Sequence, residues 1–280
     1  MQQTTYANPE VLNFYKSLPF NCRSNLEEEI NAVYKRTTND LYPGLSKLLG
    51  RDVSVLEIGC GTGWLCNSIS YLFNASVTGI DFNPVAINIA KEVAKAMKLS
   101  TSFSEQDLFL YEPLKPFDVV ISFGVLHHTN NCKLAVRILC EKFVRCGGHV
   151  MIGLYHKYGR QPFLEYFNNM KINGATEEDM LKRYRQLQSH VKDDRQILSW
   201  FYDQVLHPYE TQHTLEEMLP VLDDTGMDLI STSINHFKPI KTLKELIDME
   251  KEYYEIAMHH LKNKQYFPGF FIFLAQKKGI

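Results

Sequence analysis

The sequence has no cysteine pair spaced to hold a metal ion, although its 280 residues include six cysteines. None forms a Cys-x-x-Cys pair, and none has a partner at zinc-site spacing. In a chain of this length, we expect such cysteines to be small buried residues of a protein in a reducing compartment. The sequence thus predicts a cytoplasmic protein, neither rich in disulfides nor built on structural zinc. The cysteines are Cys22, Cys60, Cys66, Cys132, Cys140 and Cys146.

Long apolar runs and an excess of one charge are absent as well. No run approaches the roughly 20 apolar residues that span a bilayer. Residues 1–5 lack the basic and then apolar character of a signal peptide. Thirty basic residues against 32 acidic ones give a net charge of −2, which argues against binding through bulk phosphate attraction. We therefore expect neither a membrane nor a nucleic acid as the partner, and the oligomeric state stays open.

What the sequence does contain is an alternation of short apolar strands and longer amphipathic helices, from about residue 52 to residue 153. This alternation is typical of a parallel sheet in an α/β protein. Asn83 and Pro84 predict the start of a helix, with Asn83 as the N-cap. We expect a further helix over Asn131–Arg145, ended by Gly147 and Gly148. The five expected strands are Val53–Ile58, Ala75–Asp81, Ser102–Ser104, Phe117–Ser122 and His149–Leu154.

Beyond Tyr155 the pattern becomes helical and then returns to α/β. With 45% hydrophobic and 22% charged residues, the chain is expected to fold as an ordinary globular protein. We predict a Rossmann-like, mostly parallel seven-stranded sheet with helices on both faces and a helical lid. Strands at Asp228–Ile234 and Gly269–Gln276 complete this sheet. The expected divisions are a helical lead-in (1–45), a nucleotide-binding core (46–155), a helical insertion (156–213) and the rest of the core (214–280), with an added helix over 242–263.

The segment Glu57–Gly63, Glu-Ile-Gly-Cys-Gly-Thr-Gly, follows the first expected strand. A glycine turn there allows a ligand to approach bare backbone at the start of a helix. Alone this is weak evidence, since such turns also occur for structural reasons. Asp81 ends the second strand about 20 residues later, at the spacing of a carboxylate that binds ribose hydroxyls. Asp107 follows the third strand, where it can contact an adenine amino group.

Two residues around the glycine turn indicate which nucleotide is bound. A dinucleotide site needs a third glycine at the position that Trp64 occupies, because the helix must pack closely against the strand. The acidic Glu57 is poorly suited to a pyrophosphate and well suited to an ammonium group. An amino-acid tail therefore fits this site better than a diphosphate.

With these features in place, residues 50–154 resemble a class I S-adenosylmethionine-dependent methyltransferase. The segments that resemble the four motifs of that superfamily are Val55–Gly63, Gly79–Asn83, Gln106–Leu108 and Phe117–His128. Cys146-Gly147-Gly148 resembles its Pro-Gly-Gly turn, with cysteine in place of proline. The resemblance implies S-adenosyl-L-methionine as cofactor and S-adenosyl-L-homocysteine as product. It also implies cofactor contacts from Gly59, Cys60 and Gly61 to the methionine part, from Asp81 to the ribose, from Phe82, Asp107 and Leu108 to the adenine, and from Phe123 and Gly124 near the sulfonium.

Polar residues outside these motifs are candidates for binding the methyl acceptor. His128 lies in the loop after the fourth strand, where a neutral imidazole can accept a proton or simply shape the pocket. Tyr155 and Arg160, with His156 between them, leave the fifth strand at the same edge and are candidates for substrate binding. The segment 203–214 is densely polar, and we expect it to form a substrate pocket or to cap the next helix. A metal site at His207, Glu210 and His213 is disfavoured, because Pro208 breaks the helix that would align them.

The topology predicts that His128, His207 and Glu210 converge near the transferable methyl group. Both ends of the helical insertion return to the same sheet edge, and His128 follows a strand that ends there. These residues are the candidate catalytic groups, acting as a general base or by positioning the acceptor. The N-terminal aromatic segment 15–21 can either fold over the cofactor or form a packed lead-in.

Three functions are compatible with the sequence. The first is transfer of a methyl group to oxygen or nitrogen of a small molecule, with the helical insertion as the acceptor lid. The second is modification of a tRNA or a protein, for which residues 182–185 are the one modest basic cluster. The third is a non-catalytic regulatory protein that binds the nucleoside. The retention of Glu57, Asp81 and Asp107 argues against the third.

Overall fold

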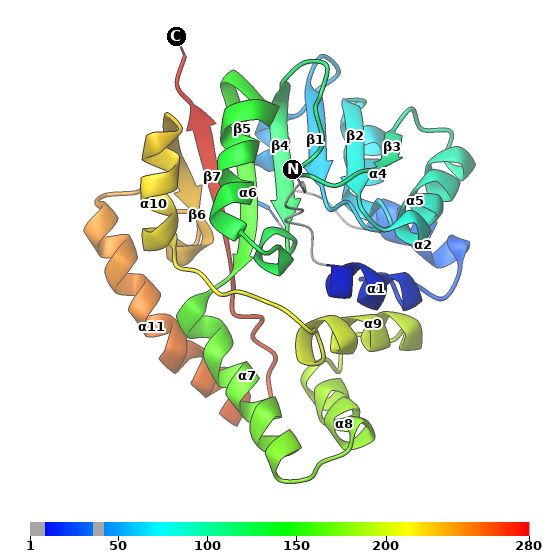
Figure 1. Ribbon diagram of the computed structural model, residues 1–280, viewed down its shortest axis with the longest axis vertical. Coiled ribbons are helices and arrows are strands. Elements are labelled where there is room, and N and C mark those ends of the chain that lie inside the picture. The colour runs from blue at the N-terminus through cyan, green and yellow to red at the C-terminus, as the bar shows by residue number, and fades with distance from the viewer. Residues whose placement is uncertain (1–8, 36–41, 280) are drawn as a thin grey trace, which may run out of the picture.

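A seven-stranded sheet forms the centre of the computed structural model, which describes residues 9–35 and 42–279 (Figure 1). The strand order is β3-β2-β1-β4-β5-β7-β6. β7 pairs antiparallel with both of its neighbours, and the other pairings are parallel. The predicted mostly parallel sheet is therefore confirmed. The strands are β1 (Ser54–Ile58), β2 (Ser76–Asp81), β3 (Ser102–Glu105), β4 (Phe117–Phe123), β5 (Val144–Tyr155), β6 (Met227–Thr232) and β7 (Phe270–Lys277).

Both faces of this sheet are buried, because alternate residues of its strands point into two separate apolar cores. On β1, Val55 enters one core while Leu56 and Ile58 enter the other. The first core contains α4 (Trp64–Phe73) and α5 (Pro84–Ala96), and the second contains α6 (Cys132–Ile138) and α10 (Leu215–Asp224). Figure 1 shows α6 in front of the sheet and α4 behind it.

The start of α5 follows the local rules of helix capping. The Asn83 side chain accepts a hydrogen bond of 3.0 Å from the backbone N–H of Val85, and Pro84 occupies the first turn. The predicted cap is confirmed, and it fixes the chain directly after the carboxyl end of β2.

The predicted helix Asn131–Arg145 is wrong at its end. α6 passes into a short π-helical segment, η3 (Leu139–Phe143), and β5 begins at Val144. The pairing of β4 with β5 is interrupted by an irregularity and resumes at Val119 and His149. Gly147 has a φ of 74° within this irregularity, so the glycine pair serves a bulge in the strand rather than a helix end. Cys146 is exposed there, contrary to the expectation that all cysteines are buried, while the other five are buried.

The segment between β5 and α10 is helical, as expected of the insertion, and has its own apolar core. It comprises α7 (Lys157–Ile172), α8 (Glu177–Leu187) and α9 (Asp194–Val205), which lie below the sheet in Figure 1. Phe163, Tyr184 and Phe201 are among the buried residues that join the three helices. α7 also packs along α11 (Leu243–Lys262). The insertion is therefore a small packed unit beside the carboxyl edge of the sheet.

Two N-terminal helices close the other side of this edge. α1 (Pro9–Ser17) lies next to α9 in Figure 1, and α2 (Leu26–Lys35) packs on α4 and α5. The predicted lead-in over 1–45 falls partly outside the described residues. Within the described part of the chain, no helix combines the length and the apolar character that a membrane crossing requires.

Candidate active site

A cavity lies at the carboxyl edge of the sheet, where the loops after β1, β2, β3 and β4 meet the N-terminal segment. This is where ligands of open α/β sheets bind. Most of the predicted cofactor residues are on its wall. The wall includes Gly59, Gly61, Asp81, Phe82, Asn83, Asp107, Leu108, Phe123, Gly124, Val125 and His128 from the sheet side, and Val11, Tyr15, Pro19 and Phe20 from the N-terminal side.

The glycine loop after β1 requires glycine for its backbone conformation and for close packing. Gly59 has a φ of 68°, and a Cβ there would overlap the Val125 side chain at 2.3 Å. Gly61 has a φ of 52°, and a Cβ there would meet no atom closer than 4.0 Å. This loop therefore leaves bare backbone along the cavity, as the methionine part of S-adenosylmethionine requires.

Asp81 connects this loop to the end of β2. One carboxylate oxygen accepts a bond of 2.9 Å from the Gly61 N–H, and the other accepts one of 2.8 Å from the Asn83 N–H. Burial raises the pKa of this carboxyl above its usual value. The carboxylate oxygens have further lone pairs and Asp81 lies on the cavity wall. The residue is thus held rigidly where it can bind the two ribose hydroxyls.

The loop after β3 forms the other end of the cavity. Asp107 accepts a hydrogen bond of 2.9 Å from the Phe109 N–H, which fixes the turn. Leu108 and Phe82 add apolar surface on the same wall. These residues lie together on the wall, and their contacts to an adenine ring stay a prediction.

Glu57 and Cys60 are predicted cofactor residues that do not belong to the cavity wall. The Glu57 carboxyl accepts a hydrogen bond of 2.9 Å from Cys66 Sγ, on the α4 side of the loop. Burial raises the pKa of Glu57 to about 8 and that of the Cys60 thiol to about 11. The Glu57 side chain therefore lies behind the glycine loop and can act on a ligand only through that loop.

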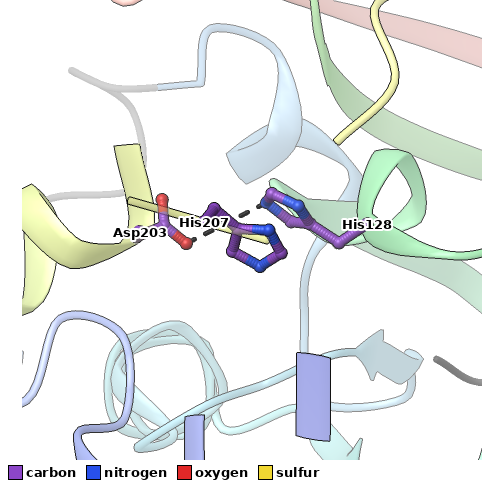
Figure 2. A group of neighbouring side chains, drawn as sticks. All are labelled: His128, Asp203 and His207. Carbon is purple, nitrogen blue, oxygen red and sulfur yellow. Dashed lines mark ion pairs between the residues drawn. The ribbon is translucent and has the colours of Figure 1, made fainter. Parts of the chain in front are cut away.

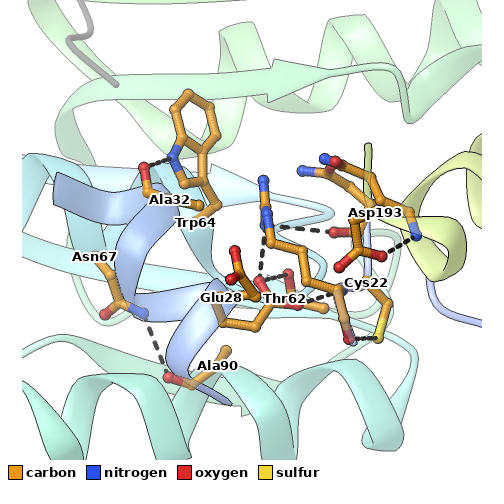
Figure 3. A network of polar contacts seen from close by, with 12 residues as sticks. Cys22, Glu28, Ala32, Thr62, Trp64, Asn67, Ala90 and Asp193 are labelled. Carbon is orange, nitrogen blue, oxygen red and sulfur yellow. Dashed lines mark hydrogen bonds and ion pairs between the residues drawn. The ribbon is translucent and has the colours of Figure 1, made fainter. Parts of the chain in front are cut away.

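Trp64, which replaces the dinucleotide glycine, anchors the N-terminal helices to the loop. Its indole Nε1 donates a bond of 3.0 Å to the carbonyl of Ala32 on α2 (Figure 3). Thr62 donates one of 3.5 Å to Glu29, which is also paired with Arg23 at 2.8 Å. These contacts hold α2 against the glycine loop. Asn83 Nδ2 donates a bond of 2.8 Å to the Tyr15 carbonyl, and Tyr15 and Phe20 lie on the cavity wall. Of the two alternatives for the segment 15–21, this geometry favours a cover over the cofactor.

Beside the cavity, His128, Asp203 and His207 come together although 79 residues separate the two histidines in sequence. The imidazole centroids lie 3.8 Å apart, and His128 Nε2 is 3.9 Å from an Asp203 oxygen (Figure 2). The Tyr15 hydroxyl donates to the same Asp203 oxygen, and the Tyr155 hydroxyl donates to the other at 3.3 Å. The predicted approach of His128 and His207 is present in the structure. Asp203 and Tyr15 are members of this cluster that sequence reasoning missed.

Burial shifts the pKa of two groups in this cluster. It raises the pKa of Asp203 and, together with the neighbouring His128, lowers the pKa of His207 to about 2. His207 is consequently a neutral imidazole at physiological pH. His127, in contrast, accepts a backbone bond from the Tyr155 N–H at 3.2 Å and is fully buried. We assign His127 to the loop scaffold.

The other predicted acceptor residues form a separate buried network. The Arg160 guanidinium donates to both oxygens of Glu210, at 3.1 and 2.9 Å, and to the Gln204 carbonyl at 2.6 Å. It also stacks on the Tyr155 ring at 4.0 Å. Arg160 is fully buried, and neither it nor Tyr155 lies on the cavity wall. Both oxygens of Glu210 are bonded to Arg160, and its role beside the two histidines stays a prediction.

Two further histidines from the sequence analysis have structural partners. His156 faces Glu250 at 3.1 Å with both side chains buried, and His213 faces Glu217 at 3.2 Å. Glu250 also accepts bonds from the first N–H groups of α10, which is a favourable place for a carboxylate. His156 therefore connects the start of α7 to α11 and, through Glu250, to the start of α10, while His213 pairs with a carboxylate of α10.

Comparison with known proteins defines the class to which this fold and cavity belong. The model of the methyltransferase domain family matches residues 49–189, half of the chain. The chain therefore belongs to this family, that of the class I S-adenosylmethionine-dependent methyltransferases.

Its relatives share moderate identity over part of their length. A ubiquinone biosynthesis O-methyltransferase of Pelagibacter ubique is 29% identical over 107 residues, which cover 38% of this chain and 44% of that protein. A malonyl-[acyl-carrier protein] O-methyltransferase of Bacillus cereus is 28% identical over 158 residues, 55% of this chain and 52% of that protein. The chain spans about half of the length of these relatives, or less.

Solved structures support the fold. Magnesium protoporphyrin IX methyltransferase from Synechocystis PCC 6803, with bound S-adenosylhomocysteine, has a TM-score of 0.53 at 15% identity and covers 96% of this chain and 94% of its own. PKMT2 from Rickettsia typhi, also in complex with S-adenosylhomocysteine, has a TM-score of 0.59 at 14% identity, with coverages of 98% and 54%. At 14–15% sequence identity, the similarity to these structures establishes the shared fold alone.

Proposed function

We propose that the protein transfers a methyl group from S-adenosylmethionine to an oxygen or nitrogen atom of a small molecule. The observation that carries this proposal is the cavity itself. Its wall combines a bare glycine loop, a rigidly held Asp81, the residues Asp107 and Leu108 after β3, and His128 after β4. Two of the relatives are named as O-methyltransferases, which points in the same direction, whereas a third is named as a putative protein N5-glutamine methyltransferase.

The residues of this chain then bind the cofactor, position the nucleophile and accept its proton. When bound, S-adenosylmethionine supplies a methyl group on a sulfonium, so the reaction needs a nucleophile held in line and a place for its proton. We assign ribose binding to Asp81, and the wall beside the sulfonium to Phe123 and Gly124. Glu57 acts from behind the loop, where its carboxylate form would favour the ammonium group of the cofactor.

We assign the acceptor to the side of the cavity where His128 and His207 meet. Two roles are open to these histidines, and kinetics separates them. Removal of a proton acceptor lowers kcat by about two to four decades and leaves cofactor affinity nearly unchanged. Removal of a positioning group instead raises the apparent KM for the acceptor.

A small acceptor is favoured over a macromolecule because helices cover this side of the cavity. Tyr15 of α1 bonds to Asp203 of α9 directly beside His128. A tRNA or a protein side chain would have to displace this contact. The net charge of −2 also gives no general attraction for nucleic acid. All six cysteines carry free thiols, which supports a cytoplasmic location.

A transfer assay with separate acceptor pools tests the proposal. The protein is incubated with S-adenosylmethionine and pools of phenols, carboxylic acids, amines, bulk tRNA or bulk protein, and S-adenosylhomocysteine is quantified by mass spectrometry. We expect product with a small-molecule pool, its loss in Asp81→Ala, and wild-type turnover in the surface control Asp228→Ala.

Other outcomes of the assay identify the alternatives. Transfer to tRNA or protein alone would replace the small-molecule proposal with a macromolecular one. Tight cofactor binding with no transfer to any pool would favour the regulatory function.

A further inference from the structure

The cluster of His128, Asp203 and His207 has the composition of a metal site. One nitrogen of each imidazole and one carboxylate oxygen lie within 4.8 Å of one another (Figure 2). The side chains of His128 and Asp203 are 5% and 8% exposed. Nε2 of His128 and Nε2 of His207 are both buried and have no hydrogen-bond partner among the described residues. Two buried imidazole nitrogens without partners are costly unless a ligand satisfies them.

The surroundings of these side chains match the outer shell of a metal centre. Metal-bound histidines commonly donate their other ring N–H to a backbone carbonyl, and His128 Nδ1 lies 3.0 Å from the Tyr209 carbonyl oxygen. Ligating carboxylates are themselves hydrogen-bonded, and Asp203 accepts bonds from the hydroxyls of Tyr15 and Tyr155. With His128 Nδ1 as the donor, Nε2 keeps its lone pair toward Asp203 and His207.

We propose that His128, His207 and Asp203 bind one divalent transition-metal ion at the acceptor end of the cavity. Two imidazoles and one carboxylate suit Fe²⁺, Mn²⁺, Co²⁺ or Zn²⁺, and leave coordination positions open. Donor atoms of one ion lie about 3–3.5 Å apart, so the three donor atoms approach by about 1 Å on binding, and the two imidazole rings, whose centroids lie 3.8 Å apart, splay to point at the ion. The metal-site reading from the sequence named His207, Glu210 and His213; the geometry replaces the last two with His128 and Asp203.

Binding through His207 requires a change of tautomer. In the structure, His207 Nδ1 accepts a bond of 3.1 Å from the Tyr209 N–H, so its proton is on Nε2. Coordination by Nε2 moves the remaining proton to Nδ1, with no net gain or loss of protons by the neutral ring. The Tyr209 amide then gives up this bond, and we expect residues 207–209 to shift when the ion binds.

The role of the ion in methyl transfer rests on the proposed function, whereas the metal site itself is argued from the geometry of the side chains. His128 lies on the cavity wall, so an open coordination position there can hold an acceptor oxygen beside the methyl group. This would favour acceptors with a hydroxyl or carboxylate over amines, because oxygen ligands keep a second lone pair for attack.

Metal titration of the chelator-treated, full-length protein tests the site without knowledge of the acceptor. Co²⁺ is added while absorbance between 500 and 700 nm is recorded, and Zn²⁺ binding is measured by calorimetry. We expect one equivalent of either ion, with the ligand-field bands of imidazole-bound Co²⁺. Asp203→Asn and His207→Asn are expected to weaken binding at least about 100-fold, and Tyr15→Phe, which removes an outer-shell bond, about 10-fold. His190→Asn, the same change at an exposed histidine of the insertion, should bind like wild type.

Binding of S-adenosylhomocysteine to Asp203→Asn and His207→Asn is the folding control, because Asp203 and His207 lie off the cavity wall. No stoichiometric metal in wild-type protein that binds S-adenosylhomocysteine would overturn the metal site and leave the proposed function standing. A metal affinity of Asp203→Asn and His207→Asn equal to that of the wild type would also overturn the metal site. Metal binding without any methyl transfer would support the metal site and contradict the proposed methyltransferase function.

Discussion

Glu57 makes the stability of this protein depend on pH in a way that can be isolated by one substitution. The residue is 7% exposed, and burial raises the pKa of its carboxyl from 4.5 to about 8. A carboxyl whose folded-state pKa is raised contributes stability that is complete below its unfolded pKa and is lost as pH rises through the folded value. Between pH 5.5 and 8, this single group lowers the free energy of unfolding by about 3 kcal/mol.

The substitution Glu57→Gln removes this titration and keeps the shape of the neutral side chain. Its amide oxygen can still accept the hydrogen bond from Cys66 Sγ. We therefore expect the wild type to lose about 3 kcal/mol relative to Glu57→Gln between pH 5.5 and 8.5, measured as free energies from urea unfolding. Other groups titrate in both proteins and cancel in the difference. An equal difference at both pH values would refute a protonated Glu57 behind the glycine loop.

Three further predictions follow from the same contacts. Gly63→Ala should lower the free energy of unfolding by about 2–4 kcal/mol, because a Cβ there lies 2.6 Å from Ala90 Cβ at a φ of 77°; an unchanged urea midpoint would contradict this. Arg160→Met leaves the Glu210 carboxylate buried without its cation and should lower the free energy of unfolding by about 3–5 kcal/mol. Urea unfolding at neutral pH measures this loss, and an unchanged free energy would contradict it. NAD should not displace bound S-adenosylhomocysteine in a competition titration, because Trp64 blocks the close approach of a pyrophosphate-binding helix; displacement would refute the assignment of the nucleotide.

The fold was predictable where short stretches of sequence determine it. Several strands are marked by short apolar stretches, such as Phe117–Ser122, and Asn83-Pro84 determines the start of α5 by local capping. The end of α6 was not predictable, because Gly147 and Gly148 serve a bulge that depends on the pairing of β5 with β4. Glycine marks either a helix end or a strand irregularity, and only the neighbouring strand decides between them.

The cofactor side of the site was predictable for a similar reason. Asp81 and Asp107 each follow a strand of a parallel sheet, so their order in sequence gives their place at the edge. The acceptor side depends on long-range contacts. Tyr15 and Asp203 are hydrogen-bonded although 188 positions separate them in sequence, and no local sequence pattern predicts this pair. Arg160 has the residue type of a substrate ligand, yet its donors are taken by Glu210 and Gln204, which sequence alone does not reveal.

Calorimetric titration with S-adenosylhomocysteine tests the central claim, a nucleoside site built on Asp81 and the glycine loop, most directly. We predict a dissociation constant in the micromolar range for wild-type protein. Asp81→Ala should weaken binding by about one to two decades, since the lost ribose hydrogen bonds are worth about 1–3 kcal/mol. Asp228→Ala, an exposed aspartate on β6, should bind as wild type does. Absence of binding to the folded wild type, or equal affinity in Asp81→Ala, would contradict the account.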